Sequence, residues 1–309
     1  MSSLAVVKMI PRKKVIFSLE ELSPYLYISP SGIFLLLIMG YPILYAIFMS
    51  FQKYTLQTLV SKQTEFIGLV NYQAVLANPK FWIALQHSLT FTFASIFFQF
   101  TIGLGLAILF SKAFPMSNIM RGLLLSGWQI PSVVTGTIFL WLFNMDYGLI
   151  NFLLTSLKLI SEPIGWVTQA DTALITVIIV NIWLGIPFNT ILLTAGITGL
   201  PEDVYEAATV DGASAWQKLT HLTIPLLKST ILSVLMLGFI YTLRVFDVIW
   251  IMTKGGPADA TEVLPTFAYR LSFISFNFGQ SAAVSVIILV ILLAAAVVYL
   301  KNAFQEEAL

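Results

Sequence analysis

The sequence contains no cysteine and only two histidines, His87 and His221, among its 309 residues. Without cysteine the protein has no disulfide, no thiol nucleophile and no cysteine-ligated metal. The two histidines are far apart in the sequence, which argues against a histidine metal centre. We therefore expect no metal ion or cofactor to be bound by this chain.

A phosphate-binding loop is also missing. No glycine is followed by lysine anywhere in the chain, so the pattern G-x-x-x-x-G-K-[ST] does not occur. We therefore do not expect the chain to bind ATP through such a loop or to be an enzyme. Any energy from ATP would have to reach it through a partner protein.

Charged residues are scarce. They make up 10% of the chain, and hydrophobic residues make up 58%, whereas a soluble domain carries about 25% charged residues. So few charges cannot cover a water-facing surface, so a lipid bilayer is the expected solvent. The net charge of +1 also argues against a nucleic-acid partner, which would favour a basic patch.

Long apolar stretches are abundant, and a spanning helix needs about 20 mostly apolar residues. The stretches are continuously apolar, whereas the strands of a membrane β-barrel alternate between apolar and polar residues. The sequence therefore predicts an all-α, polytopic membrane helical bundle. The first stretch begins late and has no small-residue cleavage pattern, so we expect it to be retained. The six predicted spans are 27–51, 83–110, 121–144, 172–197, 229–253 and 281–303.

The distribution of lysine and arginine between the spans predicts the orientation. The side that holds both termini carries more of them, including Lys8 and Arg12, and such residues favour the cytoplasmic side. We expect a cytoplasmic segment at 1–26, a single transmembrane domain at 27–303 and a cytoplasmic tail at 304–309. The connection between the fourth and fifth spans, residues 198–228, then also lies in the cytoplasm.

The outer connection at 145–171 contains the apolar sequence "YGLINFLLTSLKLI", followed by Trp166. It fits an amphipathic helix at the outer membrane interface with an aromatic anchor. A packed extracellular connector explains the same residues equally well.

The cytoplasmic connection predicts two short helices. Pro201 suits a first helical turn, and the acidic residues Glu202 and Asp203 stabilise the positive end of the helix dipole. Gly212 can adopt the left-handed conformation that ends a helix. A second helix is expected from about Ala213 to Thr220, ending before the proline at 225 because proline cannot continue a helix.

The first of these helices has a small apolar face. Val204, Ala207 and Ala208 recur at the spacing of one helical face, so the backbone of another protein could approach closely. Glu206 beside this face offers a charge to an arginine or lysine of a partner. The alternative is a solvated connector that only caps the fourth span.

The loop also contains a recognisable motif. "EAATVDG", followed by nine residues and "LTIP", resembles the cytoplasmic coupling motif of ABC importer permeases, in the branch that takes up carbohydrates and includes maltose permeases. The two apolar residues before the proline differ from those of the family but keep their size. The residues that match the motif are Glu206, Ala207, Ala208, Asp211, Gly212 and Pro225.

The resemblance extends from about residue 24 to the end of the chain. "FIGLVNYQAVL", "FWIALQHSLTFT" and "MTKGGP" are similar to the first outer loop, the second span and the exit of the fifth span in that branch. His87 and Ser88 stand where the family usually has Asn-Thr, which affects one local hydrogen bond.

The resemblance implies a mechanism and a set of partners. A permease of this kind pairs with a second homologous permease in a bacterial or archaeal cytoplasmic membrane. Two cytoplasmic ATPase subunits bind ATP and Mg²⁺ and receive the coupling helices, and an extracellular or periplasmic binding protein delivers the solute. Closure of the ATPases drives alternating access of a sugar pathway. The sugar could be anything from a monosaccharide to an oligosaccharide.

Polar and aromatic residues inside the spans are the candidates for the pathway, because sugars combine hydroxyl groups with apolar faces. For each amide the alternative is a hydrogen bond between helices, and for tryptophan it is anchoring at the interface. Pro131 and Pro187 either kink their spans and free backbone groups or are tolerated bends. The candidates are Gln129, Asn181, Trp183, Tyr241, Arg244 and Asp247.

Arg244 and Asp247 are three residues apart, which places them on one face of a continuous helix. We expect them to neutralise each other, either as an internal ion pair that joins spans or as pathway residues that bind sugar hydroxyls or an acidic group.

Three other functions remain open. A self-sufficient secondary transporter or channel is disfavoured, because we find no strong internal repeat and few acidic residues in the spans. A membrane enzyme would need clustered histidine or acidic residues, which are not evident. An importer of glycerol-3-phosphate or another non-sugar solute would share the loop motif.

Overall fold

The computed structural model describes residues 19–112 and 114–307. The described chain forms two compact units, Met1–Phe48 and Met49–Leu309. Most of the predicted cytoplasmic segment 1–26, and residues 308 and 309 of the predicted tail, lie outside the described residues.

The first unit is helical. Helix α1 (Leu19–Leu35), a π-helical segment (Leu36–Gly40) and helix α2 (Tyr41–Ser50), which runs across the unit boundary, follow one another directly. Over Pro24–Ser50 they form one apolar stretch of 27 residues, long enough to cross a bilayer. Its apolar side chains are mostly exposed, as expected of a helix whose solvent is lipid.

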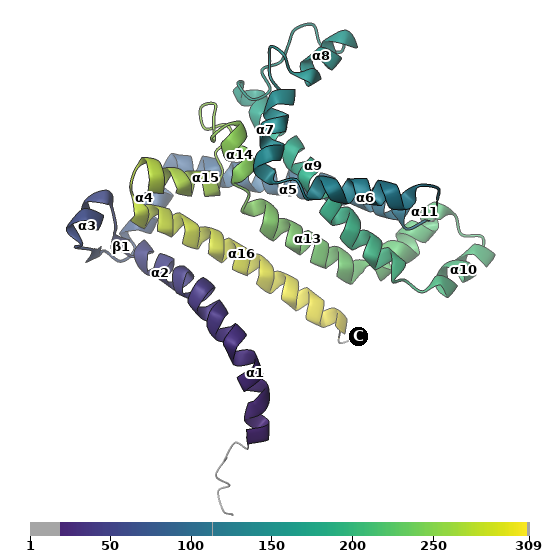
Figure 1. Ribbon diagram of the computed structural model, residues 1–309, viewed down its shortest axis with the longest axis horizontal. Coiled ribbons are helices and arrows are strands. Elements are labelled where there is room, and N and C mark those ends of the chain that lie inside the picture. Colours follow the sequence, from purple (N-terminus) through teal and green to yellow (C-terminus); the bar gives the residue numbers. More distant parts are fainter. Residues whose placement is uncertain (1–18, 113, 308–309) are drawn as a thin grey trace, which may run out of the picture. The chain divides into compact units, whose positions relative to one another are not determined.

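The second unit contains the other long helices, which lie side by side in its centre (Figure 1). With Pro24–Ser50, the described chain has five helices that are long and apolar enough to span a membrane, or up to six if one bent pair counts as a span. The protein is therefore an all-α membrane protein. The long helices are α5 (Pro79–Phe110), α9 (Ala170–Thr198), α13 (Lys228–Leu243) continued by α14 (Asp247–Met252), and α16 (Phe278–Glu307).

A bent pair of helices occupies the position of the third span predicted over 121–144, and the break falls at Pro131, one of the two predicted sites of a kink. Helix α6 (Ser117–Trp128) and helix α7 (Ser132–Leu142) meet at 95°. Pro131 stands directly before α7 with φ −55° and ψ 138°, and its missing N–H prevents the helix from continuing. Pro187, in contrast, lies inside the unbroken helix α9.

Small residues let α5 and α9 pack closely. A Cβ at Gly103 would lie 2.7 Å from Asn189 Cβ, and one at Gly185 would overlap the side-chain amide of Gln99. Gln99 Nε2 donates to Asn181 O at 2.7 Å across this contact. Close backbone approach and interhelical hydrogen bonds are the forces that join helices when the solvent is lipid.

Short elements surround one end of the bundle. Two strands pair in antiparallel fashion, with Gln52 opposite Phe66, and Asn71 Nδ2 bonds to Gln52 O at 2.8 Å. Ser88 Oγ accepts the Leu264 N–H at 2.7 Å. Ser88, which stands where the family usually has threonine, therefore makes a buried hydrogen bond. The short elements are β1 (Gln52–Lys53), α3 (Leu56–Ser61), β2 (Glu65–Phe66), α4 (Val70–Ala77), α8 (Leu149–Ser156), α15 (Leu264–Tyr269) and a π-helical segment (Arg270–Ile274).

The connection between α9 and α13 is helical and lies at the opposite end of the second unit (Figure 1). It consists of α10 (Glu202–Val210), α11 (Ala215–Lys218), a π-helical segment (Leu219–Thr223) and α12 (Ile224–Leu226).

Candidate functional site

The first helix of the connection begins as its sequence predicts. Pro201 precedes α10 with φ −62° and ψ 127°, and Glu202 and Asp203 occupy the first turn. The two carboxylates face the positive end of the helix dipole and stabilise it.

Helix α10 ends at a glycine. Gly212 has φ +76°, a conformation in which a side chain is strained. Its N–H donates to Thr209 O at 3.1 Å, and the Ala213 N–H donates to Ala208 O at 2.9 Å. This pair of bonds is the Schellman motif, which satisfies the last carbonyls of a helix. The prediction for Gly212 is confirmed.

The second helix differs from its prediction. Ser214 and Gln217 form a capping box at its start, which favours helix initiation. The chain does not stop before Pro225 but continues through the π-helical segment into α12, where Pro225 lies in the first turn. The wider π turn accommodates a proline that an α-helical interior would exclude.

The two short helices are joined by their own side chains. Tyr205 Oη lies 2.9 Å from Thr223 Oγ1, and Lys218 Nζ donates to Thr209 Oγ1 at 2.6 Å. The first bond links the middle of α10 to the π-helical segment, and the second links the end of α10 to the end of α11. The connection is therefore an ordered elbow, and we call residues 198–228 the coupling loop.

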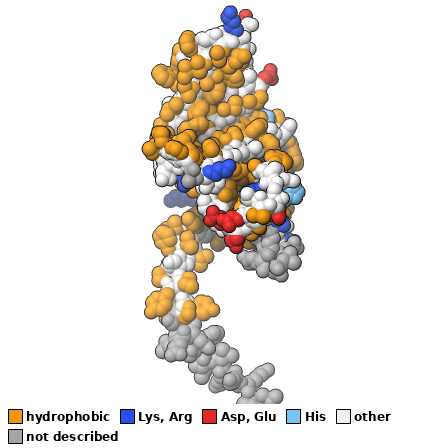
Figure 2. All heavy atoms as spheres, turned by 90° about the vertical axis from the view of Figure 1, so that its right-hand side faces the viewer, with side chains coloured by type: hydrophobic (Ala, Val, Ile, Leu, Met, Phe, Trp, Pro, Cys, Tyr) orange, Lys and Arg blue, Asp and Glu red, His pale blue; other side chains and the backbone are white. Residues whose placement is uncertain are grey.

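The coupling loop presents apolar and acidic side chains to the outside. Val210 is 89% exposed and Trp216 71% exposed. Glu206 and Ala207 are exposed, and Ala208 is half-buried; Glu206 has no ion pair within the described chain. Figure 2 shows acidic side chains gathered on this end of the molecule, where α10 carries Glu202, Asp203 and Glu206 and Asp211 follows it.

A cavity of about 530 Å³ lies between the long helices and the bend of the α6–α7 pair. We call it the inner cavity. Aromatic rings and hydrogen-bonding groups share its wall. The residues that define it here are Gln99, Trp128, Ser132, Asn181, Phe188, Asn189, Tyr241 and Thr242.

Asn181 is the most informative residue of this wall. It is 5% exposed, and its backbone oxygen accepts from Gln99. Its side-chain Nδ2 has no hydrogen-bond partner within the described chain. A buried amide without a partner costs free energy, and a ligand hydroxyl in the cavity would provide one.

A smaller cavity of about 250 Å³ shares Ser132, Asn181 and Tyr241 with the inner cavity and adds Arg244 and Asp247. The structure thus brings four of the six predicted pathway residues together: Asn181, Tyr241, Arg244 and Asp247. Gln129 is exposed at the bend, and Trp183 stacks edge-on against Phe139 with centroids 5.4 Å apart. Neither of these two lines the cavities described here.

The predicted ion pair between Arg244 and Asp247 is wrong. Helix α13 ends at Leu243 and α14 begins at Asp247, so the two residues are not on one helical face. Asp247 Oδ2 instead accepts from Ser132 Oγ at 3.0 Å. Among the described residues Arg244 has no ion-pair partner.

Several cavity residues were not predicted. Gln99 and Phe188 line the inner cavity but lie in long apolar stretches whose sequence does not indicate which face turns inward. Trp128 lines the same cavity, although Gln129 next to it was the predicted residue. The only sequence signal for Gln99 was a polar residue in the middle of a span.

Comparison with known proteins identifies the family to which this chain belongs. The family model described as "Binding-protein-dependent transport system inner membrane component" matches residues 99–306. The chain belongs to this family. It is therefore a permease of the binding-protein-dependent ABC transporters, a multi-pass protein of the inner (cytoplasmic) membrane, and not itself the ATPase.

Relatives within the permease family carry names of sugar uptake systems. The trehalose/maltose transport system permease of Thermococcus litoralis is 33% identical, with 76% of this chain and 79% of that protein covered. The diacetylchitobiose uptake system permease of Streptomyces coelicolor is 30% identical, with 93% and 88% covered. These relatives confirm the predicted carbohydrate-uptake branch.

A solved structure shares the fold. A chain of a bacterial ABC transporter involved in the import of the acidic polysaccharide alginate aligns with a TM-score of 0.76, over 91% of this chain and 96% of that chain. The sequences are 23% identical, so the likeness shows that the permease fold is common to both.

Proposed function

We propose that this permease moves a sugar or sugar derivative across the cytoplasmic membrane through the inner cavity. The observation that carries this is the unpartnered Asn181 amide in a cavity of about 530 Å³ with aromatic walls. Small-molecule sites have about this size, about 300–1,000 Å³, and combine apolar walls with a few placed polar groups. The relatives named for trehalose/maltose and diacetylchitobiose uptake support a sugar as the solute.

We propose that the coupling loop receives the driving force. Its elbow is internally bonded, and its outer surface carries exposed Glu206, Val210 and Trp216. Exposed apolar side chains beside unpaired carboxylates fit a protein partner that offers an apolar cleft and basic side chains. In this proposal two cytoplasmic ATPase subunits bind ATP and Mg²⁺ and hold the loop, both termini lie on the same side, and no cofactor binds to this chain.

The remaining partners follow from the same proposal. A second homologous permease completes the pathway, and an extracellular binding protein delivers the sugar. The family name, which describes its members as binding-protein-dependent, supports the second of these partners. Movement of the coupling loops tilts the spans and alternates access to the inner cavity.

The test is uptake of radiolabelled sugars by the complete transporter in proteoliposomes that contain ATP. Trehalose, maltose and diacetylchitobiose are the first sugars to measure. Asn181→Ala should lower uptake of the transported sugar at least tenfold while the complex assembles normally. The control is Thr194→Ala, because Thr194 lies on the same helix and bonds only within it. Uptake unchanged by Asn181→Ala would contradict the role of the cavity.

Arg244 favours a second candidate, an acidic solute such as a phosphorylated or carboxylated one. Its guanidinium lines the smaller cavity without an ion-pair partner in the described chain, and arginine binds such groups in a two-point geometry. Glycerol-3-phosphate uptake that Arg244→Gln abolishes, with sugar uptake absent throughout, would establish this candidate and exclude the first.

A further inference from the structure

A second, larger hollow lies beyond the far ends of α7 and α14. It has a volume of about 970 Å³, and we call it the outer groove. Its lining comes mainly from two segments, which we call its walls: Thr137, Trp141, Asn144 and Tyr147 in and after α7, and Lys254 and Pro257 after α14. The residues of the inner cavity are absent from its lining.

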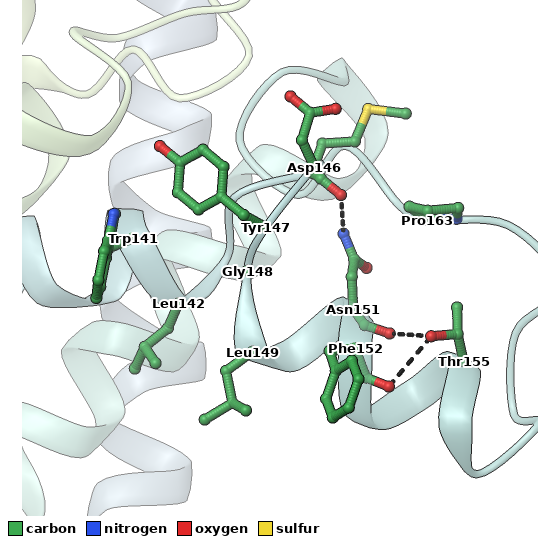
Figure 3. Close-up of a pocket in the computed structure, with 11 residues that line it drawn as sticks. Trp141, Leu142, Asp146, Tyr147, Gly148, Leu149, Asn151, Phe152, Thr155 and Pro163 are labelled. Carbon is green, nitrogen blue, oxygen red and sulfur yellow. Dashed lines mark hydrogen bonds between the residues drawn. The ribbon is translucent and has the colours of Figure 1, made fainter.

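The first wall is an aromatic corner with polar neighbours. Trp141 is 69% exposed and Tyr147 65% exposed, and their ring centroids lie 6.3 Å apart at 62°. Thr137 and Trp141 are four residues apart in α7, so their side chains share a face, and Asn144 follows shortly after the helix ends at Leu142. Figure 3 shows Trp141 at the end of α7 with Tyr147 beside it on the following turn.

The turn that carries Tyr147 is rigidly held. Asn144 Oδ1 accepts the N–H groups of Asp146 at 2.9 Å and Tyr147 at 3.3 Å. Asn151, 3% exposed, bonds to the backbone of Met145 and Ile164 and accepts from Trp166 Nε1 at 2.9 Å. In Figure 3 the Asn151 amide points at this turn. The aromatic corner is therefore ordered without a ligand.

The other wall is held by an ion pair between Arg270 and the buried carboxylate of Glu262. Arg270 Nη2 donates to Lys254 O at 2.7 Å, and Arg270 Nε lies 2.8 Å from Glu262 Oε2. Thr261 Oγ1 donates to Gly256 O at 2.8 Å. A Cβ at Gly255 would overlap Glu262 Oε2, so glycine is needed for this approach. The backbone of residues 254–257 is thus fixed where it faces the aromatic corner.

The outer groove and the inner cavity are both lined by residues of α7. Ser132, at the start of α7, lines the inner cavity, and Trp141, near its end, lines the outer groove. At 1.5 Å per residue these positions are about 13 Å apart along the helix. Gly136 between them lets α7 pack closely on α14, since a Cβ there would lie 3.4 Å from Ile251 Cγ2.

We propose that the outer groove is a second carbohydrate-binding site, which holds the sugar before it enters the inner cavity. This inference rests on the proposed function. The ring faces of Trp141 and Tyr147 stack on the apolar C–H faces of a sugar, and the polar groups of Thr137 and Asn144 bond to its hydroxyls. Walls that are ordered in advance lower the entropy cost of binding.

The test measures uptake by the complete transporter in proteoliposomes at limiting concentrations of sugar-loaded binding protein. It uses whichever of trehalose, maltose and diacetylchitobiose the unmodified transporter takes up. Trp141→Ala should lower uptake about tenfold, the size expected for one lost aromatic contact, and Trp141→Phe should restore most of it. The control is Phe152→Ala, because Phe152 is a similarly exposed ring that does not line the outer groove.

Two further measurements separate this role from others. The affinity for the binding protein and the ATPase activity stimulated by unloaded binding protein should be the same in Trp141→Ala and the unmodified transporter. Uptake unchanged by Trp141→Ala, or a loss explained by weaker binding-protein affinity, would overturn the outer site. If the unmodified transporter takes up none of the three sugars, or if uptake is unchanged by Asn181→Ala, the proposed function itself fails.

Discussion

The coupling loop and the turn at residues 253–262 are both connections between helices, and both depend on a glycine with positive φ. They use their charged residues in opposite ways. Glu206 of the coupling loop is exposed and unpaired within the described chain, whereas Glu262 of the turn is 1% exposed and paired with Arg270.

The difference indicates what each connection does. An unpaired, exposed carboxylate adds little to the stability of its own chain and remains free to bind a partner. A buried carboxylate with a charged partner holds its own backbone, here the wall of the outer groove. The Glu206 carboxylate is thus available for the proposed protein partner, whereas Glu262 makes its own turn rigid.

The largest expected effect is on stability. Arg270→Ala leaves the buried Glu262 without its charge partner. Breaking a fully buried pair costs about 3–5 kcal/mol, and because Arg270 itself is 34% exposed we expect a loss at the lower end of this range. Glu206→Ala should change stability by less than about 0.5 kcal/mol, as for other surface positions. Thermal unfolding of the purified transporter in detergent measures both. Equal shifts for the two variants would remove the contrast between the connections.

Substitutions of the two glycines with positive φ, Gly255 and Gly212, test the same contrast between the connections. Gly255→Ala places a methyl group on the Glu262 carboxylate in addition to straining a φ of +83°, so we expect a loss of about 2–3 kcal/mol. Gly212→Ala meets nothing within 4 Å, and only the strain of the left-handed conformation remains, about 1 kcal/mol. Denaturation midpoints of the two variants, measured side by side, should differ in this order.

Sugar uptake, unlike stability, should be most sensitive to a change in the coupling loop. Glu206→Lys should reduce sugar uptake at least tenfold, about 1.4 kcal/mol or more, because it reverses the charge offered to the ATPase, while the protein still inserts in the membrane. ATP hydrolysis and uptake, measured in the same proteoliposomes, should become uncoupled. Glu162→Lys is the matched control, since Glu162 is exposed in the outer connection. Normal coupled uptake by Glu206→Lys would contradict the role of the loop.

The smallest effect is a dependence on pH. Burial raises the pKa of Glu262 above its ordinary value of 4.5, although Thr266 and Arg270 oppose the shift. The folded protein therefore holds this proton more tightly than the unfolded chain does. Stability from this group is present below pH 4.5 and is lost as pH rises through the raised pKa, by at most about 1.4 kcal/mol per pH unit. Unfolding temperatures of Glu262→Gln should lack this slope.

Local sequence patterns were sufficient for the helices and their ends. The apolar stretches predicted the long helices because a run of about 20 apolar residues has few alternatives to spanning a bilayer. Pro201 and Gly212 predicted the start and end of α10 because caps depend on neighbouring residues alone. The motif residues from Glu206 to Pro225 and their spacing were enough to indicate the permease family.

The same patterns failed where the outcome depended on distant residues. Arg244 and Asp247 have the spacing of an ion pair, but the helix is interrupted between them and Ser132 of another helix binds Asp247. The second helix of the coupling loop was expected to end before Pro225, and a π turn carries it past.

The sequence by itself determined that the chain is an all-α membrane protein, that it lacks a phosphate-binding loop, and that it carries the motif of a permease. These properties depend on composition and on residues close together in the chain. Only the tertiary structure decided the cavity around Asn181 and the hydrogen bond from Ser132 to Asp247. Each of these arises from the packing of segments far apart in the sequence, and packing partners are not encoded in the periodicity of any one segment.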